Sequence, residues 1–131
     1  MKVKTSELSG VQLDVAVAIA IGGNITRAQD AQVYLNGMHQ LCGEKNKRHS
    51  RYVFSPSADW SQCGPLIDGY SPVITICRGM VRTEIATLEN DVSATGIGIG
   101  ITYTISFCRA LVSLKLGDEV DIPDELMEVG E

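Results

Sequence analysis

The chain has 131 residues, of which 44% are hydrophobic and 21% are charged, and its formal net charge is −5. This length suits one ordinary domain, and a composition near the globular average excludes an intrinsically disordered chain. The acidic balance argues against binding that depends on neutralising nucleic-acid phosphates. We therefore expect a single domain over residues 1–131 that folds alone or as a homo-oligomer.

The four cysteines are widely separated, and their spacing does not resemble the CxxC pairs of metal and redox sites. An apolar signal core is not evident near the start, because the apolar run 15–21 is short and is preceded by Glu7 and Asp14. The uncharged run 93–108 is shorter than the roughly 20 residues that cross a bilayer. We expect a cytoplasmic protein with reduced thiols and no membrane segment.

A short strand and an apolar helix are predicted at the start of the chain. Residues 1–5 alternate apolar and charged side chains with the period of a half-buried strand. Residues 10–21 place apolar side chains on most of the helical circumference, which predicts a central helix. Ser9 precedes this helix as a predicted N-cap whose hydroxyl accepts a backbone hydrogen bond, while Gln12 and Asp14 mark its exposed side.

Strand segments follow in the middle of the chain. Residues 33–35 and 51–54 have strand character, and glycine, lysine and asparagine between them predict an exposed loop over 36–50. Valine, isoleucine and threonine over 72–88 predict a β-hairpin. Residues 90–100, which are rich in glycine, are expected to form a connection.

A second main helix is predicted from about residue 101 to Leu116. Lys115 complements the helix dipole near the C-terminal end, and Gly117 is a plausible stop. Pro123 permits a last short turn over 123–127. Together, the predicted elements indicate an α+β fold in which a small, mostly antiparallel sheet packs with two main helices. The side chains expected to face the core from the second helix are Ile105, Cys108, Leu111, Val112 and Leu116.

Helix or strand periodicity does not explain residues 54–67. This stretch holds the only tryptophan, Trp60, with three serines and two of the four prolines. Such clusters usually build turns, so we expect an ordered loop that follows a strand. Ordered loops on a rigid scaffold often hold functional residues, which makes this one a candidate contact surface for a protein partner. The candidate binding residues are Ser55, Ser57, Asp59, Trp60 and Gln62.

Two other hypotheses about this stretch stay open. An enzyme that acts on a small molecule or nucleotide would use Asp59 with a nearby serine or histidine, and a pocket should then be lined by Asp59 and a histidine. There is no G-x-S-x-G elbow, so no catalytic residue is assigned. A purely structural motif would lock the sheet to a helix, and Trp60 would then be buried.

The candidate metal ligands are His39, Cys42, His49 and Cys63. Zinc sites favour two close ligand pairs, and only His39 and Cys42 form such a pair here. The pattern favours exposed histidines and inert thiols over a site. We expect no metal and no cofactor.

Two further patterns suggest phosphate and nucleic acid. The glycines at 96, 98 and 100 precede a helix, but the motif of a phosphate loop is incomplete, so a flexible connection or a close packing contact is favoured. The basic run 44–51 is followed by Tyr52, Phe54 and Trp60, which could stack on a single strand. The acidic charge of the whole chain argues against that interaction, and we expect no nucleic-acid partner.

Three blocks of the chain are similar to one protein family. They are residues 2–10 with 13–18, the central Phe-Ser-Pro-Ser-Ala-Asp-Trp-Ser-Gln-Cys-Gly-Pro-Leu-Ile of 54–67, and the closing 109–126. Together they resemble the NinX-like proteins of tailed phages and prophages. The chain departs from the family pattern at Val15, where relatives tend to have tryptophan, and at Cys63, where glycine is common. The resemblance implies an accessory protein in the cytoplasm of a bacterial host, and it transfers no catalytic residue.

Overall fold

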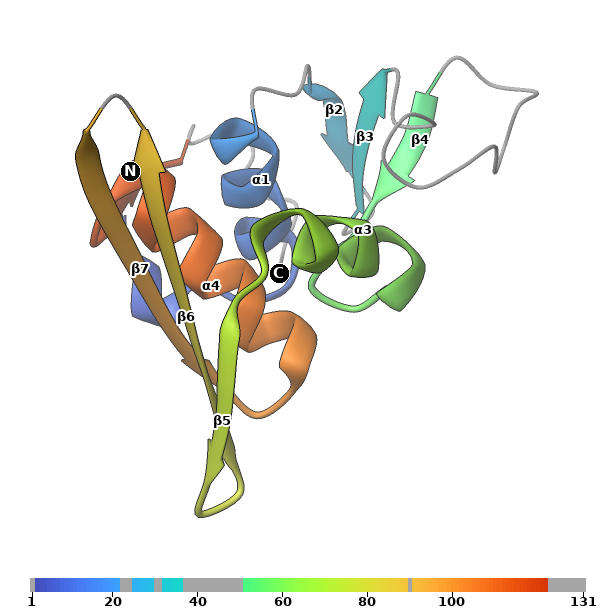
Figure 1. Cartoon of the computed structure of the whole chain (residues 1–131). Helices are drawn as coiled ribbons and strands as arrows, with labels where there is room; N and C mark the ends of the chain where they lie inside the picture. The colour runs from blue at the N-terminus through green and yellow to red at the C-terminus, as the bar shows by residue number, and fades with distance from the viewer. Residues whose placement is uncertain (1, 22–24, 30–31, 37–50, 90, 123–131) are drawn as a thin grey trace.

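The computed structural model describes residues 2–21, 25–29, 32–36, 51–89 and 91–122 (Figure 1). Within these ranges the chain forms an α+β fold in which all the strand pairs are antiparallel, as the sequence predicts. The helices are η1 (Thr5–Glu7, a 3-10 helix), α1 (Gly10–Ala20), α3 (Trp60–Tyr70) and α4 (Tyr103–Leu116). The strands are β1 (Lys2–Lys4), β2 (Ile25–Gln29), β3 (Gln32–Asn36), β4 (Arg51–Phe54), β5 (Val73–Cys77), β6 (Met80–Glu89), β7 (Val92–Gly100) and β8 (Glu119–Asp121).

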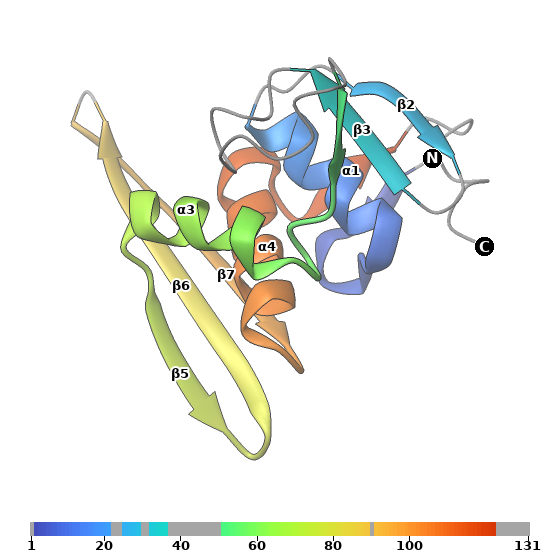
Figure 2. The same cartoon turned by 90° about the vertical axis from the view of Figure 1, so that its right-hand side faces the viewer.

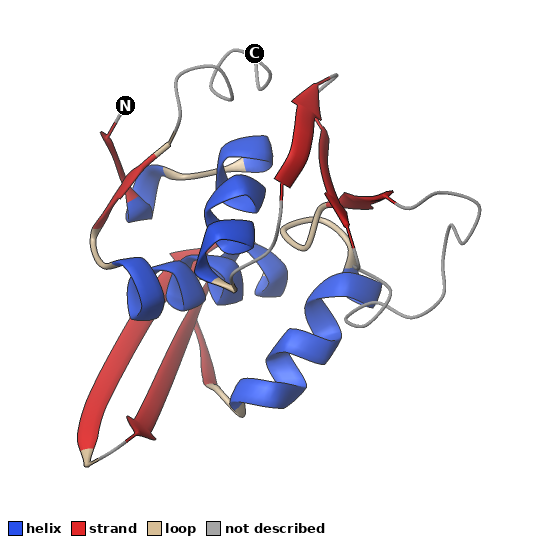
Figure 3. Ribbon diagram, turned by 90° about the horizontal axis from the view of Figure 1, so that it is seen from above, coloured by secondary structure: helices blue, strands red, loops and turns tan. Residues whose placement is uncertain are grey.

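The described strands form three sheets, ordered β1-β8, β2-β3-β4 and β5-β6-β7. The first pair joins segments from near the two ends of the chain, with Val3 opposite Val120. This pair and the β2-β3-β4 sheet lie on opposite sides of α1 (Figures 1 and 3). The predicted strands at 1–5, 33–35 and 51–54 and the predicted hairpin at 72–88 are confirmed, whereas β2 was not predicted.

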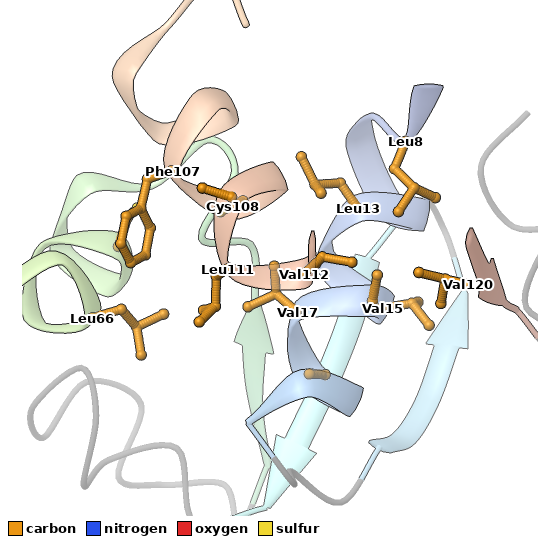
Figure 4. Close-up of a cluster of buried hydrophobic side chains, with 14 of the residues drawn as sticks. Leu8, Leu13, Val15, Val17, Leu66, Phe107, Cys108, Leu111, Val112 and Val120 are labelled. Atoms are coloured by element: carbon orange, nitrogen blue, oxygen red, sulfur yellow. The ribbon is translucent and has the colours of Figure 1, made fainter. Parts of the chain in front are cut away.

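The central helix α1 is covered on most sides, as predicted. It packs on α4, and the two helices share one continuous cluster of buried side chains. Figure 4 shows Phe107 and Leu66 at one end of this cluster and Leu8 and Val120 at the other. Among the α1 side chains whose burial the structure describes, those with no exposed surface are Leu13, Val15, Ala16, Val17 and Ala18.

Two predictions about α1 need correction. Ser9 does occupy the N-cap position, but its side chain makes no capping hydrogen bond. Asp14 was predicted on the exposed side and is instead 5% exposed. The helical period could not indicate this, because Asp14 is covered by Ser57, which lies 43 residues later in the chain.

The helix α4 is confirmed with a slightly later start. Thr102 is its N-cap, and its hydroxyl accepts a hydrogen bond from the Ile105 N–H at 3.1 Å. Gly117 ends the helix with a φ of 92°, which favours glycine. The five side chains predicted to face the core are buried or packed against the buried cluster.

The segment 90–100 was predicted as a connection, and residues 92–100 form the strand β7. Its alternate glycines face α4, which lies so close that a Cβ on Gly98 would collide with backbone atoms of Ser106 and Ala110. The Ser106 hydroxyl donates to the Gly98 carbonyl at 2.9 Å and lies 2.8 Å from the Thr83 hydroxyl. These glycines therefore permit the close approach of α4 to the sheet. Of the two favoured interpretations, a flexible connection and a close packing contact, the second is confirmed.

Some predictions fall outside the described residues. They are all but the first residue of the loop 36–50 and the final turn at 123–127. None of the helices in the described ranges is long and apolar enough to cross a membrane.

Candidate functional site

Residues 55–67 form a turn and then a helix, so the prediction of one ordered loop is wrong. The N–H groups of Ala58 and Asp59 donate to the Ser55 carbonyl at 3.1 and 2.9 Å, which closes the turn. The helix α3, labelled in Figure 2, then begins at Trp60 and continues to Tyr70 beyond the motif. Pro65 lies inside this helix, and a proline there normally argues against one because it removes a backbone donor.

Asp59 and Gln62 set the start of α3. Asp59 is the N-cap, and its Oδ1 accepts hydrogen bonds from the Ser61 N–H at 2.9 Å and the Ser61 hydroxyl at 2.7 Å. Gln62, the third residue of the helix, accepts from the Ser55 N–H at 2.7 Å through its Oε1. The spacing Asp-x-x-Gln is that of a capping box and is the sequence signal that the loop prediction missed, although Gln62 bonds to Ser55 and not to the N-cap residue itself.

Ser57 joins the motif to two helices of the core. Its backbone N–H donates to Asp14 Oδ1 of α1 at 3.0 Å, and its carbonyl accepts from Thr104 Oγ1 of α4 at 2.7 Å. Ser57, Asp14 and Thr104 are all buried, and so is Gln62. We call these four residues the anchor, because they hold the turn against α1 and α4.

Asp14 is the one ionisable side chain of the anchor. Burial raises the pKa of its carboxyl from 3.8 to about 7, although hydrogen bonds from the Ser57 backbone and side chain act in the opposite direction. The cost of desolvating the charge therefore exceeds the benefit of the hydrogen bonds. Near neutral pH, Asp14 is present in both the protonated and the ionised form.

Two fully buried thiols lie beside the anchor, Cys63 of α3 and Cys108 of α4. A hydrogen bond to Cys63, followed by burial, raises the pKa of the Cys108 thiol well above its ordinary value. A protonated, enclosed thiol is a poor nucleophile and a poor metal ligand. In the described ranges no three His, Cys, Asp or Glu side chains gather as a metal ion would need, and His39, Cys42 and His49 lie outside these ranges.

Trp60 is 57% exposed, unlike the anchor residues around it. Its ring centroid lies 6.2 Å from that of Tyr103, which is 39% exposed, and the ring planes are inclined at 48°. We call these two residues the aromatic surface. The purely structural hypothesis required a buried Trp60 and is wrong on that point, although the anchor does lock the motif to the core.

A cleft of about 540 Å³ lies elsewhere on the molecule, and none of the predicted site residues lines it. Asp59 is engaged in capping α3, and both histidines lie outside the described residues. The pairing of Asp59 with a histidine that an enzyme would need is therefore not seen in the described part of the chain. The residues lining the cleft are Lys4, Thr5, Ser6, Met80, Ile97, Gly98, Ile99, Arg109, Ser113, Asp118 and Glu119.

Replacing Thr104 with valine tests the anchor. The buried Ser57 carbonyl would lose the hydroxyl that donates to it, while the side-chain volume is kept. We expect the free energy of unfolding to fall by about 1–3 kcal/mol, measured by chemical denaturation. The control Thr95→Val alters an exposed threonine of β7 and should change it by less than about 0.5 kcal/mol. Equally small changes in both variants would contradict the anchor.

Comparison with known proteins gives one family match. Residues 4–96 match the family model described as Bacteriophage P22, NinX. The matched range includes α1, the anchor residues Asp14, Ser57 and Gln62, and Trp60, whereas Thr104 and Tyr103 lie beyond it. No curated protein matches the chain.

Proposed function

The chain belongs to the bacteriophage P22 NinX family, and from this premise we propose that this phage accessory protein acts by binding a protein partner through its aromatic surface. We place this action in the cytoplasm of the bacterial host, where phage proteins are made. The single observation that carries the proposal is the 57% exposure of Trp60, a large apolar side chain, in a motif whose residues Ser57, Gln62, Cys63 and Leu66 are buried.

The chemistry of the aromatic surface suits protein recognition. Tryptophan and tyrosine combine a large apolar area with a polar group, and they are enriched among the residues that dominate binding energies at protein interfaces. They also lose little side-chain entropy when they are fixed. Trp60 is the first residue of α3, directly after its N-cap, so its backbone is already held by the capping bonds of Asp59. A surface that is already ordered in this way loses less conformational entropy when a partner binds.

This proposal narrows the predicted binding residues. Ser57 and Gln62 are buried in the anchor, and we assign them no direct contact with a partner. Ser55 and Asp59 shape the turn and the helix start, and their role is to position Trp60. Tyr103 enters the surface from a part of the chain 43 residues later than Trp60, so sequence reasoning had no signal for it.

Photo-crosslinking in phage-infected cells tests the proposal. Benzoylphenylalanine would replace Trp60, Tyr103 or the control Leu88, an exposed apolar residue at the end of β6 next to the turn into β7. We expect the same partner protein to be crosslinked from positions 60 and 103, and that protein should not be crosslinked from position 88. Crosslinks that are equally strong at all three positions, or none from 60 and 103, would refute the proposed surface.

The variant Trp60→Ala separates binding from folding. Because the indole is mostly exposed, its removal should lower the free energy of unfolding by about 1 kcal/mol or less. The crosslink from position 103 should nevertheless disappear. A large loss of stability with the crosslink retained would instead assign Trp60 a purely structural role.

A further inference from the structure

The β5-β6-β7 sheet has one covered and one open face. Residues directly opposite each other in antiparallel strands share a face, so the register separates the two. Val81, Thr83 and Ile85 of β6 point toward α4 and are buried. The alternate residues form the other face, which we call the outer face. It is defined by two rows that cross the three strands, Val73–Glu84–Ile97 and Thr75–Arg82–Ile99.

The outer face carries exposed aliphatic side chains. Val73 is 64% exposed, Ile97 44% and Ile99 50%. The helix α4 packs on the opposite face, and within the described ranges no other helix packs extensively on this sheet (Figure 2). An uncovered group of large apolar side chains on an ordered sheet indicates an interaction surface.

The charges at the centre of the outer face indicate which partner fits. Arg82 Nη1 and Glu84 Oε1 lie 3.1 Å apart, and both side chains are partly exposed. They stand two residues apart on one strand, with aliphatic residues beside them in both rows. A two-fold axis that crosses the strands between the two rows would place each arginine against the glutamate of the other copy, Ile97 against Ile99, and Val73 against Thr75.

We propose that a second copy of this chain packs on the outer face, with Arg82 of each copy against Glu84 of the other. A membrane surface does not suit this face, because an ion pair stands at its centre. The self-complementary order of charges favours an isologous contact over an unrelated protein, which would need a matching pair of its own. This contact lies on the opposite face of the sheet from α4 and is separate from the aromatic surface.

The size of the face sets the expected affinity. Its three-stranded part is five residues long, which corresponds to about 17 Å by 14 Å from the strand rise and spacing. The area given by these two lengths is well below the roughly 800 Å² that each partner buries in a standard interface. We therefore expect a weak dimer whose population rises with concentration.

Sedimentation equilibrium over a wide range of protein concentration tests the dimer directly. Reducing agent is needed, because Cys77 is exposed on the same face and could bridge two copies. Wild type should move from monomer to dimer as concentration rises, and Ile97→Glu should stay monomeric with an unchanged circular dichroism spectrum. A wild type that is monomeric at the highest concentration, or an Ile97→Glu variant that dimerises equally well, would overturn the proposal.

Charge exchange tests the pairing itself. Arg82→Glu and Glu84→Arg should each be monomeric, since like charges would then meet across the two-fold axis. An equimolar mixture of these two variants should form a heterodimer, because one copy presents two glutamates and the other two arginines. The double variant Arg82→Glu/Glu84→Arg should dimerise as wild type does. The control Asp68→Arg changes an exposed charge of α3 and should leave dimerisation unaltered.

Only a contact in which Arg82 of one copy meets Glu84 of the other predicts that dimerisation recovers when the two single variants are mixed. Single variants that dimerise like wild type would overturn the proposal. So would single variants that fold and stay monomeric but fail to pair when mixed. Native mass spectrometry distinguishes the heterodimer from the two homodimers by mass.

Discussion

Replacing Gly98 with alanine is expected to lower the free energy of unfolding by about 3 kcal/mol or more. The added Cβ would collide with the Ala110 N–H and the Ser106 carbonyl, which are backbone atoms of α4 that no rotamer change can move. The helix would have to shift away from the sheet, and the hydrogen bond from the Ser106 hydroxyl to the Gly98 carbonyl would be strained. Urea denaturation followed by circular dichroism measures the change.

Gly69→Ala provides the matched control for Gly98→Ala. Gly69 lies in α3, and a Cβ there meets nothing within 4 Å. Because alanine is a better helix former than glycine, this variant should be more stable than wild type by about 0.5–1 kcal/mol. Opposite effects of the same substitution would confirm that close packing, and not the loss of glycine, weakens Gly98→Ala. A Gly98→Ala variant as stable as wild type would contradict the close approach of α4 to β7.

Asp14→Asn is expected to remove a large pH dependence of stability. Burial raises the pKa of Asp14 from 3.8 to about 7, so between these values the folded chain keeps a proton that the unfolded chain releases. The free energy of unfolding contributed by this group is therefore fully present below about pH 4 and falls as pH rises to about 7. The difference between these two pKa values corresponds to about 4 kcal/mol in the free energy of unfolding.

The expected result is a difference between two pH profiles. Asparagine resembles the protonated acid in shape and can still accept the Ser57 N–H bond, so the two proteins should have similar stability near pH 4. Above pH 7 the variant should be the more stable one. Asp68→Asn removes an exposed carboxyl and should follow the wild-type profile. Parallel profiles of wild type and Asp14→Asn would show that Asp14 ionises as freely in the folded chain as in the unfolded one.

The local patterns of the chain predict most of the core. The nearly continuous apolar run of α1 and the valine, isoleucine and threonine of the β5-β6 hairpin are local signals, and Gly117 marks the end of α4 where a positive φ is required. These signals depend on residues close together in sequence. They therefore do not need tertiary information.

Two of the failed predictions share a physical cause, which is a contact between segments far apart in the sequence. Asp14 looks exposed in a helical projection, and only its contact with Ser57 explains its burial. The glycines of β7 resemble a connection until α4 is seen against them. The helix α3 is different, because the spacing of Asp59 and Gln62 marks a helix start in the sequence itself, and the loop prediction overlooked it.

In the candidate site, too, some features follow from the local sequence and others only from the folded structure. The stretch 54–67 was identified from its composition, and it does lie where α1, α3 and α4 are joined. Its residues have two separate roles that composition cannot distinguish. Ser57 and Gln62 face inward, while Trp60 faces outward and meets Tyr103 from α4.

Acrylamide quenching of the intrinsic fluorescence tests most directly whether the motif presents its tryptophan to a partner. Trp60 is the only tryptophan, so its emission is free of other contributions. In the folded protein alone we predict quenching nearly as efficient as in the urea-unfolded chain, because Trp60 is 57% exposed. Tyr103→Ala should leave the quenching as efficient or make it more so. A folded protein whose tryptophan is shielded from acrylamide would contradict the aromatic surface and return the motif to a purely structural role.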